Sequence, residues 1–341
     1  MGVTPAGPDG PARRRILSID GGGIRGIIPL CALAALERTT GRPARETFSF
    51  VAGTSTGALI AAAVAAGIPA RQVLDLYVTR ARGLFATYPW SLPQRVLLGY
   101  LYSTRTLHDL ITDELGAARG WTLNDAPIDL LITAKRVADG MPWYFVRDNP
   151  RNARRTGRLA LADCATASAA APTYFQPWTV PEDTATLPRG AEPVGTLVDG
   201  SVGVAGNPAY QACVEAFDYA EGYVPARATL VSLGTGRYAP RGTPAWIGSW
   251  LRWVLDELLR SPGEQQTELV RRHYPELAFY RIDPQLRRDI ALDDTGGIDE
   301  LRRIGEDLAA RIDWDAILAG AGSTFAVTDR NTLWQAYSKS V

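Results

Sequence analysis

A chain of 341 residues, 46% of them hydrophobic and 21% charged, is long enough to bury a substantial core. Its 36 basic and 36 acidic residues balance, so the composition does not indicate a nucleic acid polymer as a partner. The three cysteines are odd in number and widely spaced, which fits neither a disulfide framework nor a zinc-binding pattern. We expect buried free thiols at Cys31, Cys164 and Cys213.

The first residues lack the apolar core of a signal peptide, and no apolar run is long enough to span a bilayer. We therefore expect a cytoplasmic protein. Glycine and proline are frequent in residues 1–13, which predicts a flexible tail. Residues 14–341 are expected to form a single domain, with peripheral helices at about 240–341.

An apolar strand ends in a glycine-rich turn at residues 20–26. Gly21, Gly23 and Gly26 fit the dinucleotide-binding pattern, but Glu46, at the spacing of a ribose-binding acid, precedes the second strand instead of ending it. A Walker-type phosphate loop is excluded because the chain contains no Gly-Lys pair. The alternative, which we favour, is an oxyanion hole formed by backbone N–H groups at a helix start.

The second turn follows a strand predicted at residues 48–52 and precedes a helix predicted at 58–66. Between them, the run from Gly53 to Gly57 places Ser55 in the pattern G-x-S-x-G, which is typical of a nucleophile elbow. A βαβ unit brings both turns to the same edge of a parallel sheet. We therefore expect the glycine loop to face Ser55.

The rest of the chain alternates between predicted helices and strands. We expect helices at 27–39, 69–82, 106–115 and 159–171, and strands at 130–134, 141–146, 195–198 and 228–233.

Three stretches have two interpretations each. Aromatic residues among prolines and glycines at 84–102 fit either a mobile lid or acyl-chain channel beside the active site, or a loop packed over the core. The basic stretch 151–158 fits either contact with lipid phosphates or, as we favour, a solvated loop. The tryptophan-rich helix at 246–259 fits a membrane interface, but we place packing on its own sheet slightly ahead.

A serine nucleophile needs a base. The chain has two histidines, His108 and His273, and neither lies at a strand end, so a surface or capping role is expected for both. Asp199 follows a predicted strand and precedes a glycine, a position that suits either a general base or a turn aspartate.

Together these motifs resemble the patatin-like phospholipase family. The resemblance is carried by Asp-Gly-Gly-Gly-Ile-Arg-Gly, by Gly-Thr-Ser-Thr-Gly and by the late Asp199-Gly200 pair, and residues 165–177 and 230–236 are also similar. It implies a patatin-like α/β fold with three α/β/α layers, a mainly parallel central sheet and a Ser-Asp dyad.

By this resemblance, Ser55 attacks an ester carbonyl and Asp199 accepts its proton. Arg25 supports the glycine loop or binds the substrate phosphate, and no metal or other cofactor is implied. The oxyanion would be held by the N–H groups of three glycines, Gly21, Gly22 and Gly23.

The implied function is a serine lipid acyl hydrolase that acts on membrane phospholipids during transient contact with the inner membrane. An acyltransferase or cyclising enzyme with the same acyl-Ser55, or a nucleotide-binding regulatory protein that uses the glycine loop, are the alternatives. Several bacterial members that the chain resembles are antiviral effectors switched on by a cyclic oligonucleotide. The resemblance therefore predicts a cyclic-nucleotide activator, with residues 84–102 as the segment that moves.

Overall fold

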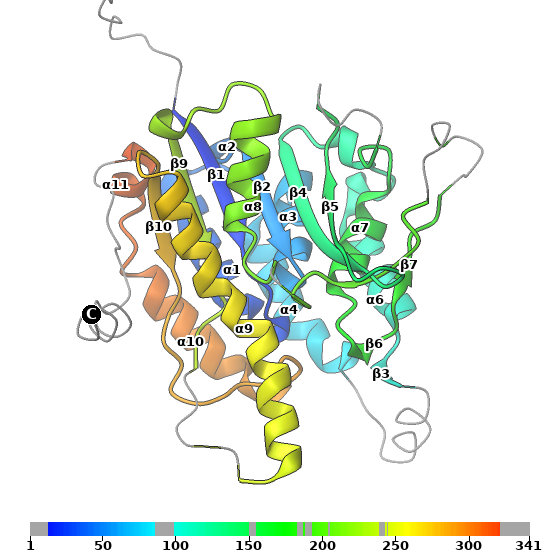
Figure 1. The fold of residues 1–341 in the computed structure, drawn as a ribbon. Coiled ribbons are helices and arrows are strands. Elements are labelled where there is room, and N and C mark those ends of the chain that lie inside the picture. The colour runs from blue at the N-terminus through cyan, green and yellow to red at the C-terminus, as the bar shows by residue number, and fades with distance from the viewer. Residues whose placement is uncertain are drawn as a thin grey trace, which may run out of the picture.

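The structure is a computed structural model of the whole chain, shown in Figure 1. It describes residues 13–85, 99–149, 155–182, 187, 193–203, 205–238, 243 and 245–320. Within these ranges, it describes only the backbone of residues 248 and 251–262.

The centre of the fold is an eight-stranded sheet with the order β10-β9-β1-β2-β4-β8-β7, in which β5 pairs with the other edge of β4. Strands β1, β2, β4, β9 and β10 run parallel, whereas β5, β7 and β8 pair antiparallel. Two short strands, β3 (Tyr100–Tyr102) and β6 (Thr173–Phe175), pair with each other outside this sheet. The strands of the main sheet are β1 (Arg14–Ile19), β2 (Phe50–Thr54), β4 (Asp129–Arg136), β5 (Pro142–Val146), β7 (Trp178–Thr179), β8 (Thr196–Asp199), β9 (Ala228–Leu233) and β10 (Ala278–Ile282).

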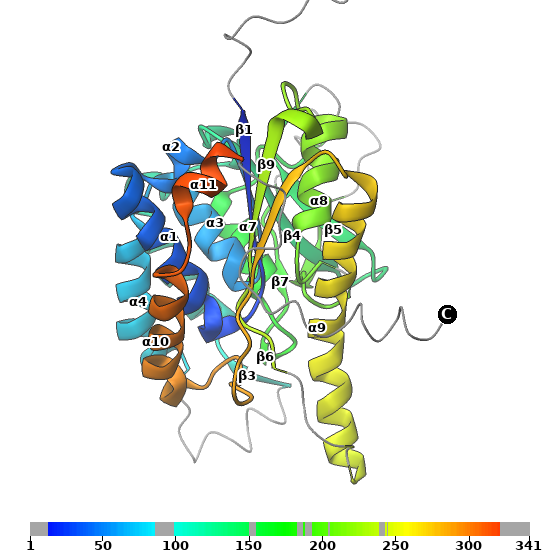
Figure 2. The ribbon, with the colours of Figure 1, turned by 90° about the vertical axis from the view of Figure 1, so that its left-hand side faces the viewer.

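Helices cover both faces of the sheet and give three layers (Figure 2). On one side lie α1, α3, α4 and α10, and on the other lie α8 and α9. The α-helices are α1 (Ile27–Thr40), α2 (Ala44–Thr47), α3 (Thr56–Ala66), α4 (Ala70–Leu84), α6 (Thr104–Glu114), α7 (Leu161–Ala169), α8 (Ala209–Val214), α9 (Ile247–His273), α10 (Ile298–Ala309) and α11 (Trp314–Ala319). The predicted three-layer α/β/α fold with a mainly parallel central sheet is confirmed.

The central strands are apolar over most of their length because both of their faces are buried. Successive side chains point to opposite faces, so Leu17 and Val51 join the core beneath α1 and α3, while Ile16 and Phe50 join the core beneath α8 and α9. All three cysteines are buried and free, as expected.

Strands β2 and β8 meet end to end along one edge of β4. Thr133 pairs with both β2 and β5, and Ala134 pairs with both β5 and β8, so β2 and β8 share the edge opposite β5. On that edge Thr133 is the partner of Thr54, and the next residue, Ala134, is the partner of Asp199. The last residues of two strands that run in opposite directions therefore lie next to each other.

In the C-terminal part of the chain, the sequence predicts a short extended segment near residues 279–282 among peripheral helices. The structure has a strand there, and it belongs to the main sheet: Ala278–Ile282 is β10, an edge strand. Helix α9 packs through buried Gln266 and Val270 in its second half, but its first turn projects beyond the sheet (Figure 2). The expectation that the tryptophan-rich helix packs on the sheet is wrong for this first turn, where Trp246 and Ile247 are 67% and 86% exposed.

Three other predictions fall wholly or partly outside the described residues. The tail predicted at residues 1–13 lies outside them except for residue 13. Of the aromatic segment 84–102, residues 86–98 lie outside them; at its ends, Phe85 and Tyr102 pack edge to face with ring centroids 5.1 Å apart. Of the basic stretch 151–158, residues 151–154 lie outside. Arg158 in the described part donates to Glu182 at 2.9 Å, as part of the protein's own structure.

Candidate active site

Ser55 occupies a sharp turn between β2 and α3. Its backbone has φ 55° and ψ −125°, a conformation that L-residues rarely adopt. A Cβ at Gly53 would collide with the backbone of Gly57, and a Cβ at Gly57 with the carbonyl of Ile19. The two glycines of the motif are therefore required sterically for the turn, and strain of this kind is common at functional sites.

A second contact holds the elbow. The backbone N–H of Ser55 donates to the hydroxyl of Ser168 in α7 at 2.8 Å, and Ser168 is fully buried. The sequence analysis missed Ser168, because nothing in a helix of small residues distinguishes this serine from a packing residue.

Asp199 lies beside Ser55, as the end-to-end meeting of β2 and β8 dictates. It is 2% exposed, and the hydroxyl of Ser55 is close enough to its carboxylate to lower the pKa of Asp199. The N–H of Ser201 donates to Asp199 Oδ1 at 2.8 Å. Burial raises the pKa of Asp199 to about 6, although the interactions with both serines act in the opposite direction. A carboxylate with this pKa is mostly ionised at neutral pH and can accept a proton there.

The glycine loop lies next to the elbow. A Cβ on Gly21 would lie 2.5 Å from Oγ of Ser201 and 3.1 Å from Cβ of Ser55, so a larger residue would displace one or both of these side chains. The N–H of Gly21 donates to the carbonyl of Gly206 at 2.9 Å. For the N–H groups of Gly22 and Gly23, no acceptor is present among the described residues. The predicted three-glycine oxyanion hole therefore needs a correction in this conformation: Gly21 is occupied, and Gly22 and Gly23 remain as candidates.

Asp20, at the end of β1, is anchored by Arg281 of β10. The guanidinium donates to both carboxylate oxygens, at 2.8 Å to Oδ1 and 2.5 Å to Oδ2, and a third bond of 2.9 Å reaches Asp283. Burial opposes the charge of Arg281, but the two carboxylates raise its pKa above the ordinary arginine value. The first residue of the glycine turn is thus fixed by an ion pair.

The same network reaches the loop from a second direction. Asp283 accepts from the N–H of Gly236 at 2.9 Å. The neighbouring residue, Thr235, donates its hydroxyl to the carbonyl of Gly21 at 2.7 Å. None of these contacts was found from the sequence, because Asp283, Arg281 and Thr235 lie far along the chain from the turn they hold.

Arg25 is buried within the glycine turn. Its Nε donates to the carbonyl of Gly22 at 3.3 Å, and its side chain is not among those that line the cavity described next. Of its two expected roles, this contact favours support of the loop over binding of the substrate.

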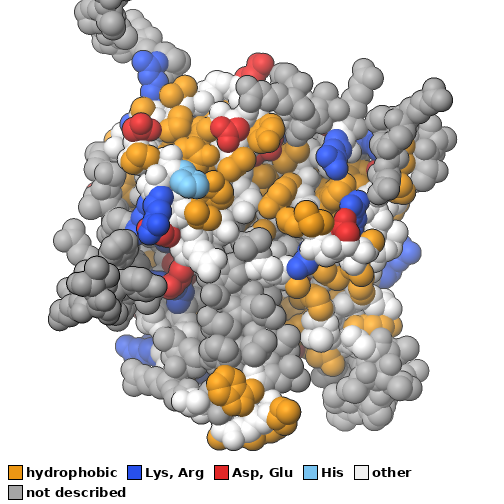
Figure 3. Space-filling model, viewed as in Figure 1, with side chains coloured by type: hydrophobic (Ala, Val, Ile, Leu, Met, Phe, Trp, Pro, Cys, Tyr) orange, Lys and Arg blue, Asp and Glu red, His pale blue; other side chains and the backbone are white. Residues whose placement is uncertain are grey.

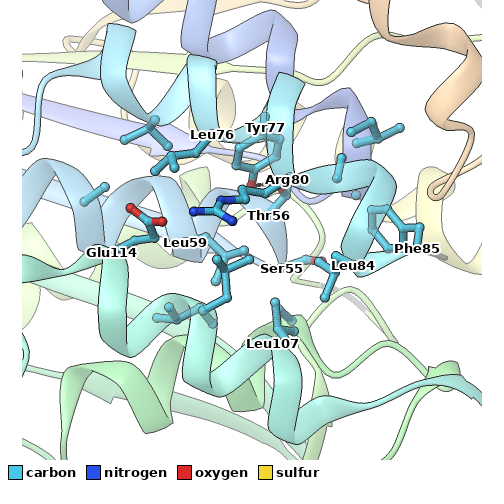
Figure 4. A pocket seen from close by; sticks show the side chains of 18 of the residues that line it. Ser55, Thr56, Leu59, Leu76, Tyr77, Arg80, Leu84, Phe85, Leu107 and Glu114 are labelled. Atoms are coloured by element: carbon cyan, nitrogen blue, oxygen red, sulfur yellow. Dashed lines mark hydrogen bonds between the residues drawn. The ribbon is translucent and has the colours of Figure 1, made fainter.

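An apolar cavity of about 160 Å³ opens from the elbow between α3, α4 and α6 (Figure 4). Ser55 and Thr56 line it together with Leu59, and further along α3 its wall includes Ala62 and Ala63. Its other walls come from Tyr77, Leu84, Phe85, Leu107, Ile111 and Phe175. Its apolar walls suit a hydrocarbon chain whose reacting end lies at Ser55.

Neither histidine takes part in this arrangement. Nε2 of His108 lies 3.3 Å from the carboxylate of Asp163, and its ring stacks on Trp178 with centroids 4.8 Å apart. Nδ1 of His273 shares a hydrogen bond of 2.7 Å with the hydroxyl of Tyr210. In the described part of the chain, no group of histidine, cysteine or acidic residues is arranged to bind a metal ion.

Comparison with known proteins identifies the family. The model described as patatin-like phospholipase matches residues 17–212, which include both turns and Asp199. The chain belongs to the patatin-like phospholipase family.

Relatives of this patatin-like protein include bacterial and plant proteins. A "cGAMP-activated phospholipase" of Escherichia coli is 34% identical over 48% of this chain and 48% of its own length, and one of Vibrio cholerae is 33% identical over 48% and 49%. Patatin-17 of Solanum cardiophyllum is 27% identical over 79% of this chain and 73% of its own. The chain thus spans about half the length of the bacterial relatives it matches.

Among solved structures, that of VipD from Legionella pneumophila matches 90% of this chain and 67% of its own, at 12% identity and a TM-score of 0.42. The family match ends before β10, so it does not include Arg281. No helix among the described residues is both long and apolar enough to cross a membrane.

Proposed function

We propose that this protein is a serine acyl hydrolase that cleaves fatty-acyl esters of membrane phospholipids. One observation carries the proposal: the strained Ser55 lies beside the buried Asp199, and its hydroxyl is close enough to the carboxylate to lower the carboxylate's pKa. The apolar cavity at Ser55 supports a long acyl chain as the group transferred.

The first half-reaction begins when Ser55 Oγ attacks the ester carbonyl carbon while its proton moves to Asp199. The N–H groups of Gly22 and Gly23 would stabilise the oxyanion of the tetrahedral intermediate. When this intermediate collapses, the ester C–O bond breaks and the departing alcohol of the lysolipid takes the proton from Asp199. The acyl group is left on Ser55.

In the second half-reaction a water molecule gives its proton to Asp199 and attacks the acyl carbon. Collapse of the new intermediate releases the fatty acid, and the proton returns to Ser55 Oγ. If another alcohol or an amine replaced water, the same residues would perform acyl transfer.

The test is hydrolysis of phospholipid by purified variants. Ser55→Ala and Asp199→Asn should each abolish hydrolysis while the fold is retained, and Ser55→Ala should also lose labelling by a fluorophosphonate probe. His108→Ala and His273→Ala are the matched controls and should keep most activity. If a histidine variant folds but is as inactive as Ser55→Ala, the proposed Ser-Asp dyad is wrong and the site is a catalytic triad that includes that histidine. Product analysis with and without an added alcohol separates hydrolysis from acyl transfer.

We further propose that a cyclic oligonucleotide activates the enzyme, in antiviral defence. Support comes from the Escherichia coli and Vibrio cholerae relatives, whose names state activation by cGAMP. The purified protein should be nearly inert toward liposomes alone and become active with one member of a cyclic-nucleotide panel. Full activity without ligand, unchanged across the panel, would mean a constitutive hydrolase.

Peripheral contact with a membrane is also proposed. Hydrophobic side chains gather at the lower tip of the molecule, where α9 begins (Figure 3). They include Trp246, Ile247 and Trp250, which are 67%, 86% and 44% exposed. The parallel strands of the sheet also end toward this side (Figure 1), so a membrane held at the tip would lie on the side of the sheet at which β2 ends and Ser55 follows.

A further inference from the structure

A second cavity lies at the opposite edge of the sheet from Ser55. It has a volume of about 550 Å³ and lies where β1, β2 and β4 begin. We call it the arginine pocket, because five arginines line it: Arg13, Arg14, Arg15, Arg45 and Arg147.

Most of these charges lack an acidic partner. Arg147 is 3.7 Å from Asp129. For the other four arginines, no carboxylate lies within 4 Å in the part of the chain that the structure describes. The pocket wall also includes Glu46, so five positive charges face two negative ones. An excess of positive charge that is partly removed from water favours an anion in the same space.

The contacts that these guanidiniums do make are to neutral groups. Arg13 donates to the carbonyl of Ala228 at 2.8 Å and to the hydroxyl of Thr229 at 3.3 Å. Arg15 donates to the carbonyl of Leu318 at 3.2 Å, and Arg45 to that of Ala66 at 3.1 Å. Arg14 lies over the ring of Tyr223, 5.4 Å from its centroid. Such contacts orient the side chains and leave their charge in place.

The walls and the position of the pocket narrow the class of anion. Pro127 and Ile128 add apolar surface beside the arginines, which suits a ligand that carries both phosphates and flat rings. Arginine is well suited to phosphate because its planar fork donates two parallel hydrogen bonds. A membrane at the exposed tip of α9 would lie at the other end of the molecule (Figure 1), so a dissolved ligand fits better than a lipid headgroup.

We propose that the arginine pocket binds a cyclic oligonucleotide and is the regulatory site of this protein. The inference rests on the proposed activation, to which it adds a location. The strands that begin at the pocket also end at the catalytic turns: β1 leads to Asp20 and β2 leads to Ser55. A ligand there can switch the enzyme only by binding the active arrangement more tightly than the resting one.

The experiment measures binding of 3′,3′-cGAMP and of other cyclic dinucleotides to the full chain by calorimetry. For the member that binds, Arg14→Gln and Arg45→Gln should each raise Kd about 10- to 100-fold, since a hydrogen bond to a charged group contributes about 1.5–3 kcal/mol. Arg42→Gln is the matched control, because Arg42 is an exposed arginine that does not line the pocket, and it should bind as the wild type does.

Three further measurements sharpen the result. Basal hydrolysis of a soluble short-chain ester and thermal melting should be unchanged in Arg14→Gln, and full activity should return at higher ligand concentration. Arg45→Lys, which keeps the charge, should bind better than Arg45→Gln. Glycerol 3-phosphate, which carries the headgroup chemistry of a phospholipid, should not displace the cyclic dinucleotide.

The outcomes separate the two proposals. If a ligand binds and activates the wild type but the pocket variants bind it equally well, the location is wrong and the activation stands. If Arg42→Gln loses as much affinity as the pocket variants, binding reflects overall charge and the pocket is not the site. If no member of the panel binds, the activation and its location both fail, while ester hydrolysis still reports on the proposed catalysis.

Discussion

Asp20 and Arg281 are 261 residues apart in the chain, yet the guanidinium of Arg281 donates to both carboxylate oxygens of Asp20. The pair joins the edge strand β10 to the first residue of the glycine turn, across the end of β9. Because the turn presents the N–H groups proposed to stabilise the oxyanion, Arg281 is a positioning residue: it acts through Asp20 and does not touch the substrate.

Arg281→Lys tests this role. Lysine keeps the positive charge but cannot form the two parallel bonds, so the turn should lose its fixed position. We expect kcat to fall about 10- to 100-fold with little change in KM, since a displacement of about 1 Å can have effects of this size. Removal of the charge would leave Asp20 buried without its cationic partner, at about 3–5 kcal/mol, and would test folding instead.

The matched control for this variant is Arg288→Lys. Arg288 also bridges two carboxylates, those of Glu300 at 2.7 Å and Asp294 at 3.1 Å, but it is half-exposed and makes no contact with the glycine turn. It should leave kcat unchanged. Equal losses in both variants, or a loss in KM alone, would contradict the positioning role.

The raised pKa of Asp199 sets the pH profile. The ionised carboxylate is the proposed base, and burial raises its pKa to about 6. Activity should therefore be present above about pH 6, and kcat/KM for a soluble ester should fall about tenfold per unit below it. Asp199→Asn removes a buried charge, so this variant should be at least as stable as the wild type at pH 7. A profile that stays flat down to pH 4 would exclude Asp199 as the base.

The glycine turn can be tested at Gly22. A Cβ there would collide with the side chain of Thr235, which holds the carbonyl of Gly21. Gly22→Ala should therefore disturb the oxyanion donors and lower kcat on the order of a hundredfold, with a smaller effect on KM. Gly83→Ala is the control, since a Cβ at Gly83 meets no other atom within 4 Å. A Gly22→Ala enzyme with normal kcat and a raised KM would point to a role in binding.

The sequence predicted those parts of the site that adjacent residues determine. Gly53 and Gly57 fix the elbow around Ser55 because their own backbones meet there, and a glycine after Asp199 marks the end of a strand. The hydrogen bond that the N–H of Gly21 donates could not be predicted in this way. It depends on the carbonyl of Gly206, which the fold brings to the turn from a distant loop.

The arginine pocket could likewise be predicted only in part from the sequence. The run from Arg13 to Arg15 is visible in the sequence, but the side chains become a pocket only because Arg45 and Arg147 arrive from other elements. The tryptophans at the start of α9 have helical spacing, which is the same for a packed helix and an exposed one. The two cases differ in whether the helix extends past the sheet. Helix α9 does so at its start, and Trp246 is therefore exposed.

The apolar cavity predicts a dependence on acyl-chain length. Ala62 and Ala63 line the cavity seven and eight residues beyond Ser55, about 10–12 Å along the axis of α3 at 1.5 Å per residue. Ala62→Leu should fill this part of the cavity and reduce kcat/KM for long-chain esters about tenfold or more. Hydrolysis of a short-chain ester is the internal control and should be unchanged, because its chain ends nearer Ser55. Equal losses on both substrates would mean that the substitution disturbs the elbow.

The exposed start of α9 predicts a difference between vesicles and soluble substrates. Tryptophan is favoured at a membrane interface because its ring is apolar and its N–H is polar. The double variant Trp246→Ser and Ile247→Ser removes the two most exposed apolar side chains of this turn. In this variant, both binding to phospholipid vesicles, measured by co-sedimentation, and hydrolysis of vesicle lipid should fall about tenfold or more.

Met141→Ser is the control for this double variant. It replaces another exposed apolar residue (57%), on the β4–β5 connection, and should bind vesicles normally. Hydrolysis of a soluble short-chain ester should be equal in all three proteins, since the tip does not line the cavity at Ser55. If the double variant sediments with vesicles as the wild type does, the start of α9 is not the membrane-binding surface and another surface binds the membrane.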